Sequence, residues 1–244
     1  FDAVHQHDCK IIVQLMHGGR VSDPRVLNGQ RPVSASATQS GGWSLYTDTD
    51  YEKQIRGIDG PWEKVTFGPA RALTIEEIHQ VADGFAAGAR RAVDAGADGV
   101  EVHGANGYLL DQFLQDSTNQ RTDGYGGSLE ARARLMLEVV DACVSVWGGG
   151  RVGLHLSPRG DAHTMGDSDP ATTFNYVARA ARRRGLAFLC AREREGADSL
   201  GPQLKESFGG VYIANEGFTR ESAEAAIAAG RADAVAFGVQ YIAN

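Results

Sequence analysis

The chain has 244 residues, and 42% of them are hydrophobic, which is enough for a sizeable core and excludes a disordered tail protein. The formal net charge of −7 repels phosphate backbones and anionic lipids, so neither nucleic acid nor a membrane is an expected partner. Three scattered cysteines and the lack of an apolar run long enough to cross a bilayer favour a reducing, cytoplasmic location.

Six short runs rich in aliphatic and β-branched residues predict strands, and each run is followed by turn residues or a helical pattern. They cover residues 10–15, 99–103, 152–157, 186–191, 210–214 and 234–238. The runs are nearly continuous in apolar residues, which is typical of strands in a parallel sheet that is covered on both faces.

Four helices are predicted between these strands because capping residues mark their starts and glycines mark several of their ends. The start signals are Thr74 with Glu77, Ser128, Asp169 with Pro170, and Thr219. The end signals are Gly96, Gly185 and Gly230. Strands and helices therefore alternate along most of the chain.

This alternation predicts an α/β fold, either a barrel or an open doubly wound sheet. Gln14, His103, His155 and Gly238 lie at or near the carboxyl ends of predicted strands, where a (β/α)8 barrel gathers its active site. The glycine-rich phosphate turn common after the first strand of an open sheet is absent from the sequence. We therefore expect residues 1–244 to form a single partial (β/α)8 TIM barrel domain, with six of the eight strands visible.

One segment, at about residues 16–73, is far longer than the usual connection between a barrel strand and its helix. It carries Trp43, Tyr46, Tyr51 and Trp62 among glycine, serine and aspartate residues. These aromatic residues favour an ordered excursion over the barrel mouth, in the form of a hairpin.

The densest group of reactive residues lies in residues 101–135. His103 and Asn106 could aim two N–H groups at a carbonyl oxygen, and so stabilise the negative charge that develops when the β carbon accepts a hydride. Tyr108 could then donate a proton to the α carbon. The alternative for each residue taken alone is structural: a strand cap, a turn with Gly107, and a packed ring.

The remaining histidines, two arginines and one methionine are expected to have structural roles. The remaining histidines lack the spacing with carboxylates that would predict a metal site. Arg132 and Arg134 are expected to pair with nearby acidic residues, and Met136 is expected in the core. Self-association into a homo-oligomer stays open.

Six separated blocks, in order along the whole chain, resemble the Old Yellow Enzyme family of FMN-dependent NAD(P)H oxidoreductases, which are ene-reductases. The blocks are VQLMHGGR, RALTIEEI, HGANGYLLDQFL with NQRTDGYGGS, LHLSP, IANEGFT and DAVAFGVQYIAN. The resemblance implies a reaction in which NADH or NADPH reduces FMN, and FMN passes a hydride to the C=C bond of an α,β-unsaturated carbonyl compound or a related small electrophile.

Carried over residue by residue, the resemblance implies that His103 and Asn106 bind the substrate carbonyl and that Tyr108 is the proton donor. It implies that Gln14 hydrogen-bonds the flavin ring. The backbone amides around Glu216, Gly217, Gly238 and Val239 are implied to hold the FMN phosphate, because free N–H groups suit an anion.

Three departures from the family pattern are expected to affect FMN binding. His155 replaces an arginine expected beside the flavin, so it supplies either a pH-dependent charge or only a neutral hydrogen bond. Val239 replaces an arginine that reaches the phosphate, and Glu216 stands where glycine is common. We therefore expect FMN to bind more weakly than is normal for the family.

The chain is expected to be truncated, because the family has two further strands before Phe1 and a helix after Asn244. One alternative is therefore a catalytically silent, cofactor-free barrel, that is, a pseudoenzyme. Another is a dienoyl-CoA reductase-like enzyme, although that branch carries a cysteine cluster that these three cysteines do not supply.

Overall fold

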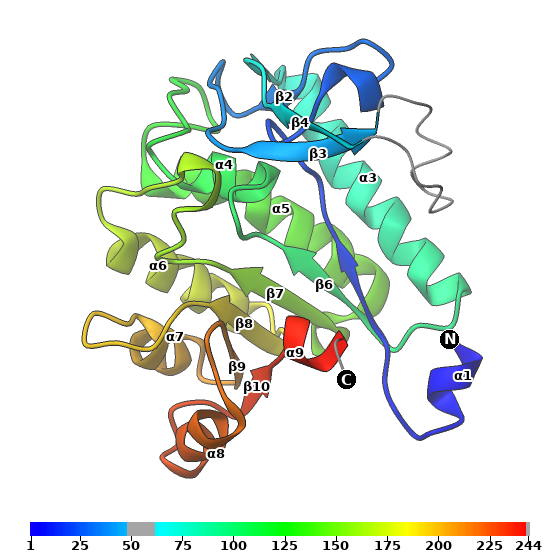
Figure 1. The fold of residues 1–244 in the computed structure, drawn as a ribbon, viewed down its shortest axis with the longest axis vertical. Coiled ribbons are helices and arrows are strands. Elements are labelled where there is room, and N and C mark those ends of the chain that lie inside the picture. Colours follow the sequence, from blue (N-terminus) through cyan, green and yellow to red (C-terminus); the bar gives the residue numbers. More distant parts are fainter. Residues whose placement is uncertain (48–61, 243–244) are drawn as a thin grey trace.

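The computed structural model of the protein describes residues 1–47 and 62–242. Its centre is a parallel sheet of six strands, curled as an incomplete (β/α)8 barrel (Figure 1). In sheet order the strands are β1 (Ile12–Leu15), β6 (Gly99–His103), β7 (Val152–Leu156), β8 (Phe188–Arg192), β9 (Val211–Asn215) and β10 (Ala234–Ala236). All six predicted strands and the fold class are thereby confirmed.

Helices connect successive strands of the sheet and lie along one of its faces (Figure 1). The longer ones are α3 (Ile75–Asp94), α5 (Leu129–Trp147), α6 (Pro170–Arg183), α7 (Gly201–Phe208) and α8 (Arg220–Ala228). The Thr74 capping box is present, and Ser128, Asp169 and Thr219 each accept a bond from a backbone N–H of the helix they begin. The remaining helices are α1 (Asp2–His5), α4 (Leu109–Leu114) and α9 (Val239–Ile242), with short 3-10 turns at Pro24–Val26, Gly149–Arg151 and Ala162–Thr164.

The core lies between the sheet and these helices. Val102, Leu154 and Leu189 on the strands are fully buried, as are Met136 and Val140 on α5. Burial of such side chains contributes about 1.5–3 kcal/mol each relative to exposure. The other face of the sheet differs from the prediction of two covered faces, because it carries polar side chains and is partly open.

The predicted excursion contains two short pairings. Strand β2 (Val33–Ser34) pairs with β5 (Arg71–Ala72), and β3 (Trp43–Thr47) pairs antiparallel with β4 (Trp62–Thr66), which confirms a hairpin. Figure 1 shows this hairpin at the end of the sheet to which the arrowheads of β1 and β6 point. Tyr51 lies outside the described residues.

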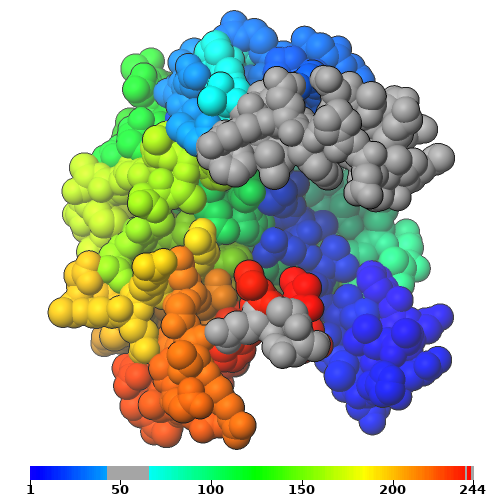
Figure 2. Space-filling view, viewed as in Figure 1, coloured from blue at the N-terminus to red at the C-terminus, as the bar shows by residue number. Residues whose placement is uncertain are grey.

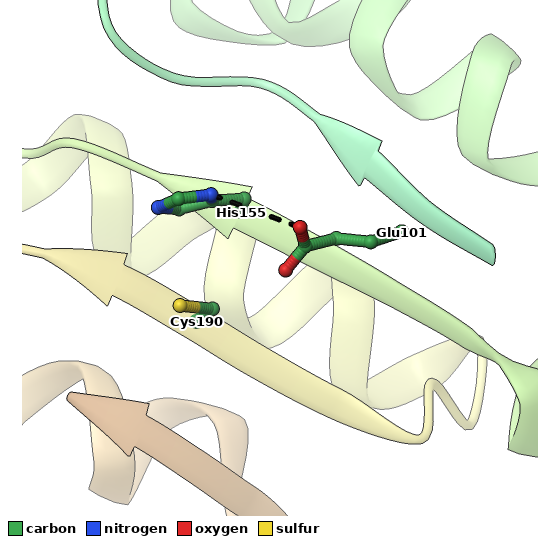
Figure 3. Close-up of side chains that lie close together, drawn as sticks. All are labelled: Glu101, His155 and Cys190. Atoms are coloured by element: carbon green, nitrogen blue, oxygen red, sulfur yellow. Dashed lines mark ion pairs between the residues drawn. The ribbon is translucent and has the colours of Figure 1, made fainter. Parts of the chain in front are cut away.

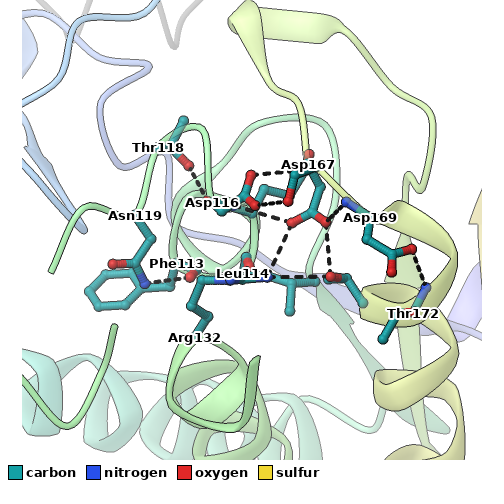
Figure 4. Close-up of polar contacts among 12 residues, drawn as sticks. Phe113, Leu114, Asp116, Thr118, Asn119, Arg132, Asp167, Asp169 and Thr172 are labelled. Carbon is teal, nitrogen blue, oxygen red and sulfur yellow. Dashed lines mark hydrogen bonds and ion pairs between the residues drawn. The ribbon is translucent and has the colours of Figure 1, made fainter. Parts of the chain in front are cut away.

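A polar network holds the loop after α4 against the start of α6 (Figure 4). Asp167 accepts bonds from the Asp116 N–H at 3.2 Å and the Thr173 hydroxyl at 2.9 Å, and it pairs with Arg132 at 3.5 Å. The expectation for Arg132 is therefore confirmed. Arg134 is also expected to pair with an acidic residue. Its guanidinium instead lies 5.5 Å from the centre of the Tyr125 ring.

Candidate active site

The inner face of the sheet, which points away from the helices, carries a row of polar side chains near the carboxyl ends of the strands. The parallel register pairs Gln14 with Glu101, His103 with His155, and His155 with Cys190. Because side chains alternate along a strand, Arg192 shares the face of Cys190. Figure 2 shows the molecule hollowed between the blue N-terminal segment and the orange and red C-terminal elements.

His103 is the most enclosed residue of this row. It is 4% exposed, and neither ring nitrogen has a hydrogen-bond partner among the described residues. Its ring centroid lies 5.2 Å from that of His155 and 5.3 Å from that of Tyr108. Burial lowers the pKa of His103 to about 4, so the imidazole is neutral at pH 7 and offers one N–H donor.

Asn106 follows β6 in a left-handed conformation with φ of 58°, and two contacts hold it. Its backbone N–H donates to the Ser157 hydroxyl oxygen at 2.7 Å, and its Oδ1 accepts a bond from Arg192 Nη1 at 2.9 Å. The amide N–H groups of its side chain have no acceptor within the described ranges. Asn106 therefore presents a free donor.

Tyr108 immediately precedes α4 and is half-buried between two histidines. Its ring centroid lies 5.3 Å from that of His103 and 5.7 Å from that of His163. In the part of the chain that the structure describes, its hydroxyl has no hydrogen-bond partner. The phenol is therefore free to hold or transfer a proton near His103.

Asp111 supports this segment from behind. It is fully buried on α4 and accepts bonds from the Gly107 N–H at 2.9 Å and from Gln115 Nε2 at 2.7 Å. Burial raises the pKa of this carboxyl to about 6. Gln112, also fully buried, donates to the carbonyl of Gly107 at 2.6 Å. The turn that carries Asn106 is thus held by buried groups of the next helix.

Gln14 and His155 lie together on the inner face, beside Glu101 and Cys190. Gln14 Nε2 donates to Glu101 and lies 3.4 Å from His155 Nδ1. Burial, with smaller effects of the nearby His103 and Arg192, lowers the pKa of His155 to about 4. This favours the neutral alternative for His155, whose Nε2 is buried without a partner in the described structure.

Glu101, His155 and Cys190 form a cluster across three neighbouring strands (Figure 3). Their potential ligand atoms lie within 4.8 Å of one another, and His155 Nδ1 is 3.8 Å from Glu101 Oε2. Burial raises the pKa of Glu101 and raises that of the Cys190 thiol to about 12. Sequence spacing does not reveal this cluster, because the register of the sheet brings its members together.

The residues assigned to the phosphate end lie at the ends of β9 and β10, which are paired side by side. The backbone N–H groups of Glu216, Gly217, Gly238 and Val239 donate to no acceptor in residues 1–47 and 62–242. Glu216 has φ of 92°, and its carboxylate pairs with Arg192 at 3.1 Å. Val239 is 83% exposed. Four free amides are thus available for an anion.

Arg192, His163 and Asp111 are site residues that sequence reasoning missed. Arg192 directly follows the predicted strand at 186–191, and its position two residues after Cys190 was the available signal, because such residues share a face of a strand. Asp111 lies inside the motif that follows β6, but nothing in its spacing distinguishes a buried carboxylate from an exposed one.

The burial of His103 and the partial burial of His155 predict how the stability of the chain depends on pH. Their folded pKa values, about 4, lie below the ordinary value of 6.5, so between these limits the unfolded chain takes up protons that the folded chain does not. The contribution of these two histidines to stability is therefore fully present above pH 6.5 and is lost as the pH falls toward 4, by on the order of 3 kcal/mol per histidine. Asp111 opposes this trend, because its pKa is raised to about 6 and the folded chain therefore takes up one proton there before the unfolded chain does.

Urea unfolding at pH 4.5, 5.5 and 6.5 measures this slope. We expect the His155→Asn variant to have a flatter profile than the wild type, and the exposed His7→Asn control to retain the wild-type slope. Equal slopes for wild type and His155→Asn would show that His155 titrates normally in the folded chain.

A parallel barrel sheet with unsatisfied donors at the carboxyl ends of its strands is the arrangement of a barrel enzyme. Comparison with known proteins gives the class. The model of the NADH:flavin oxidoreductase / NADH oxidase family matches residues 1–244, and the chain belongs to that family. The resemblance to Old Yellow Enzyme is thereby confirmed.

Individual relatives agree with this assignment. The chain is 40% identical to the putative 12-oxophytodienoate reductase-like protein 1 of Arabidopsis thaliana, and the alignment covers 100% of this chain and 72% of that protein. It is 38% identical to 12-oxophytodienoate reductase 1 of Oryza sativa subsp. japonica, and that alignment covers 100% of this chain and 62% of that protein. Morphinone reductase in complex with tetrahydroNAD superimposes with a TM-score of 0.91 at 38% identity, over 100% of this chain and 65% of that one.

The old yellow enzyme homologue from Zymomonas mobilis gives a TM-score of 0.88 at 35% identity, over 100% of this chain and 66% of that one. The chain therefore spans about two thirds of the length of the relatives it matches. Within the described residues, no helix has the length and apolar character needed to span a membrane.

Proposed function

We propose that the chain carries the substrate site of an FMN-dependent oxidoreductase that passes a hydride from NADH or NADPH, through the flavin, to the C=C bond of an α,β-unsaturated carbonyl compound. The observation that carries the proposal is the group of His103, Asn106 and Tyr108. Two free N–H donors and a free phenol lie together at one strand end. These are the groups needed to polarise a carbonyl and to protonate the carbon next to it.

The residues present fit FMN. Three buried ring nitrogens, two of His103 and one of His155, lack partners in the described structure, and a buried polar atom left unpaired costs about 1–3 kcal/mol. A polar planar ligand over the inner face would satisfy them. The free amides of the β9 and β10 ends supply donors for a phosphate. When bound, FMN supplies the hydride chemistry, and the protein supplies orientation and electrostatics.

The chain's own residues would then divide the work. His103 and Asn106 donate to the substrate oxygen and stabilise the charge that develops on it. Tyr108 holds a proton at its hydroxyl for the α carbon. Gln14 and neutral His155 would bond the edge of the flavin ring, and the amides of Glu216, Gly217, Gly238 and Val239 would hold its phosphate.

The test is to titrate the purified chain with FMN while recording the flavin absorption bands, and then to follow NADPH oxidation with cyclohex-2-enone. We expect a saturable shift of the bands and formation of cyclohexanone. A chain that is folded but leaves the flavin spectrum unchanged at millimolar FMN would overturn the proposal for this chain and favour the cofactor-free, catalytically silent alternative.

The Val239→Arg variant is expected to bind FMN about tenfold to a hundredfold more tightly than the wild type, because a charge-assisted bond to phosphate is worth about 1.5–3 kcal/mol. Val239 is exposed and beside free amides, so the longer side chain has room. The dissociation constant from the same titration measures the gain.

The matched control is Tyr241→Arg, which adds the same charge at an exposed position on the same short helix. We expect it to change FMN affinity by less than about threefold, the effect of an added surface charge. An equal gain in both variants would show that net charge, and not a phosphate contact at residue 239, controls affinity.

A further inference from the structure

Arg192 links the substrate side of the site to its phosphate side. It ends β8 and donates from Nη1 to Asn106 Oδ1 at 2.9 Å and from Nη2 to Glu216 Oε1 at 3.1 Å. Its two partners come from the ends of β6 and β9, so one guanidinium joins three separate strand ends. None of these three residues is adjacent to another in the sequence.

The contact with Arg192 fixes which end of the Asn106 amide faces the site. A guanidinium has five N–H donors and no acceptor, so only the oxygen of an amide can face it. The NH2 group of Asn106 is therefore the free end. Without the guanidinium, the oxygen and NH2 ends of an amide can exchange places by a rotation, and some of the molecules would then present an acceptor to the substrate.

Arg192 is itself held in place. Glu216, whose backbone has φ of 92°, supplies the carboxylate that anchors it, and Asn215 next to it pairs with Arg192 in the sheet register. The backbone of Asn106 is fixed by Ser157. Arg194 lies 3.7 Å from the same carboxylate but is largely exposed, and no contact with Asn106 is present in the described structure. Among these residues, Arg192 is therefore the one that connects the two sides.

We propose that Arg192 is a positioning residue for Asn106: its guanidinium, anchored by Glu216, holds the Asn106 amide with the NH2 group turned toward the substrate carbonyl. The effect of Arg192 on catalysis rests on the proposed function, but its contact with Asn106 can be tested without cofactor. The ends of β6, β8 and β9 then act as one unit.

The first measurement uses the side-chain amide signals of Asn106 in ¹⁵N NMR spectra of the chain without added FMN, assigned by their loss in Asn106→Asp. We expect Arg192→Met to shift these signals and Arg194→Met to leave them in place. Glu216→Gln, which replaces the charged anchor of the guanidinium by a neutral amide, should shift them in the same direction by less, and it also serves if Arg192→Met fails to fold.

The second measurement is kcat/KM for cyclohex-2-enone with FMN bound. Arg192→Met is expected to lower it about tenfold, Arg192→Lys to restore part of the loss, and Arg194→Met to change nothing. Unshifted Asn106 signals in both Arg192→Met and Glu216→Gln would overturn the inference. Shifted signals in a chain that reduces no enone would instead uphold the Arg192 contact and refute the proposed function.

Discussion

Replacing His103 with Leu is expected to slow the reduction of cyclohex-2-enone about a hundredfold, because a lost oxyanion donor costs about 10²–10³ in rate. The same change is expected to stabilise the folded chain. His103 is buried with both ring nitrogens unpartnered in the described structure, and leucine fills a similar volume without polar atoms. We expect the free energy of unfolding to rise by about 1–3 kcal/mol at pH 7.

Opposite changes in stability and rate would identify His103 as a residue retained for function. Urea unfolding gives the free energy, and NADPH-dependent enone reduction gives the rate. His103→Asn is the informative companion, because it keeps a donor near the same place and should retain more activity than the leucine variant. His7→Leu, at an exposed position, controls for a general effect of added leucine on unfolding.

The outcome that contradicts this prediction is a leucine variant that is less stable than the wild type. It would mean that His103 packs or bonds in a way that favours the folded state, which is the structural alternative stated for it from the sequence. A loss of rate below about threefold would separately remove His103 from the carbonyl site, since a hydrocarbon cannot replace an oxyanion donor.

The elements that can be predicted from the sequence are those whose signal is local. The strands are recognisable because each is a short run rich in aliphatic residues bounded by turn residues. Thr74 and Asp169 are recognisable because the role of a capping residue depends on the next three residues only. Helix α4 escapes prediction because it has six residues, all of them buried, so it has no polar face and no amphipathic period. Helix α7 begins at a Gly-Pro pair, which is typical of a turn.

The candidate site follows the same division. His103, Asn106 and Tyr108 fall within six residues, so one motif contains all three. Arg192 lies 86 residues from Asn106, and only the parallel register of β6, β7 and β8 brings the two together. Gln14, His103 and His155 of the inner face are predicted at strand ends, but Glu101 escapes prediction because it stands between two valines in the run GVEVH.

Replacing Asp111 with Ala is expected to lower the free energy of unfolding by about 3 kcal/mol, since it leaves the buried Gly107 N–H and the Gln115 amide without acceptors, at about 1–3 kcal/mol each. Enone reduction should fall with it, although Asp111 lies behind the turn, because the Asn106 backbone at φ of 58° depends on that turn. Urea unfolding and kcat/KM measure the two effects.

Asp111→Asn separates charge from shape, because it keeps the volume and one acceptor oxygen. Burial raises the pKa of Asp111 to about 6 in the folded chain, so this carboxyl favours folding below its ordinary pKa of about 4, and that contribution is lost as the pH rises through 6. The asparagine variant has no such ionisation. Its stability relative to the wild type, measured by urea unfolding, should therefore improve between pH 4.5 and pH 7. A constant difference over that range would instead show that Asp111 ionises in the folded chain as it does in the unfolded one.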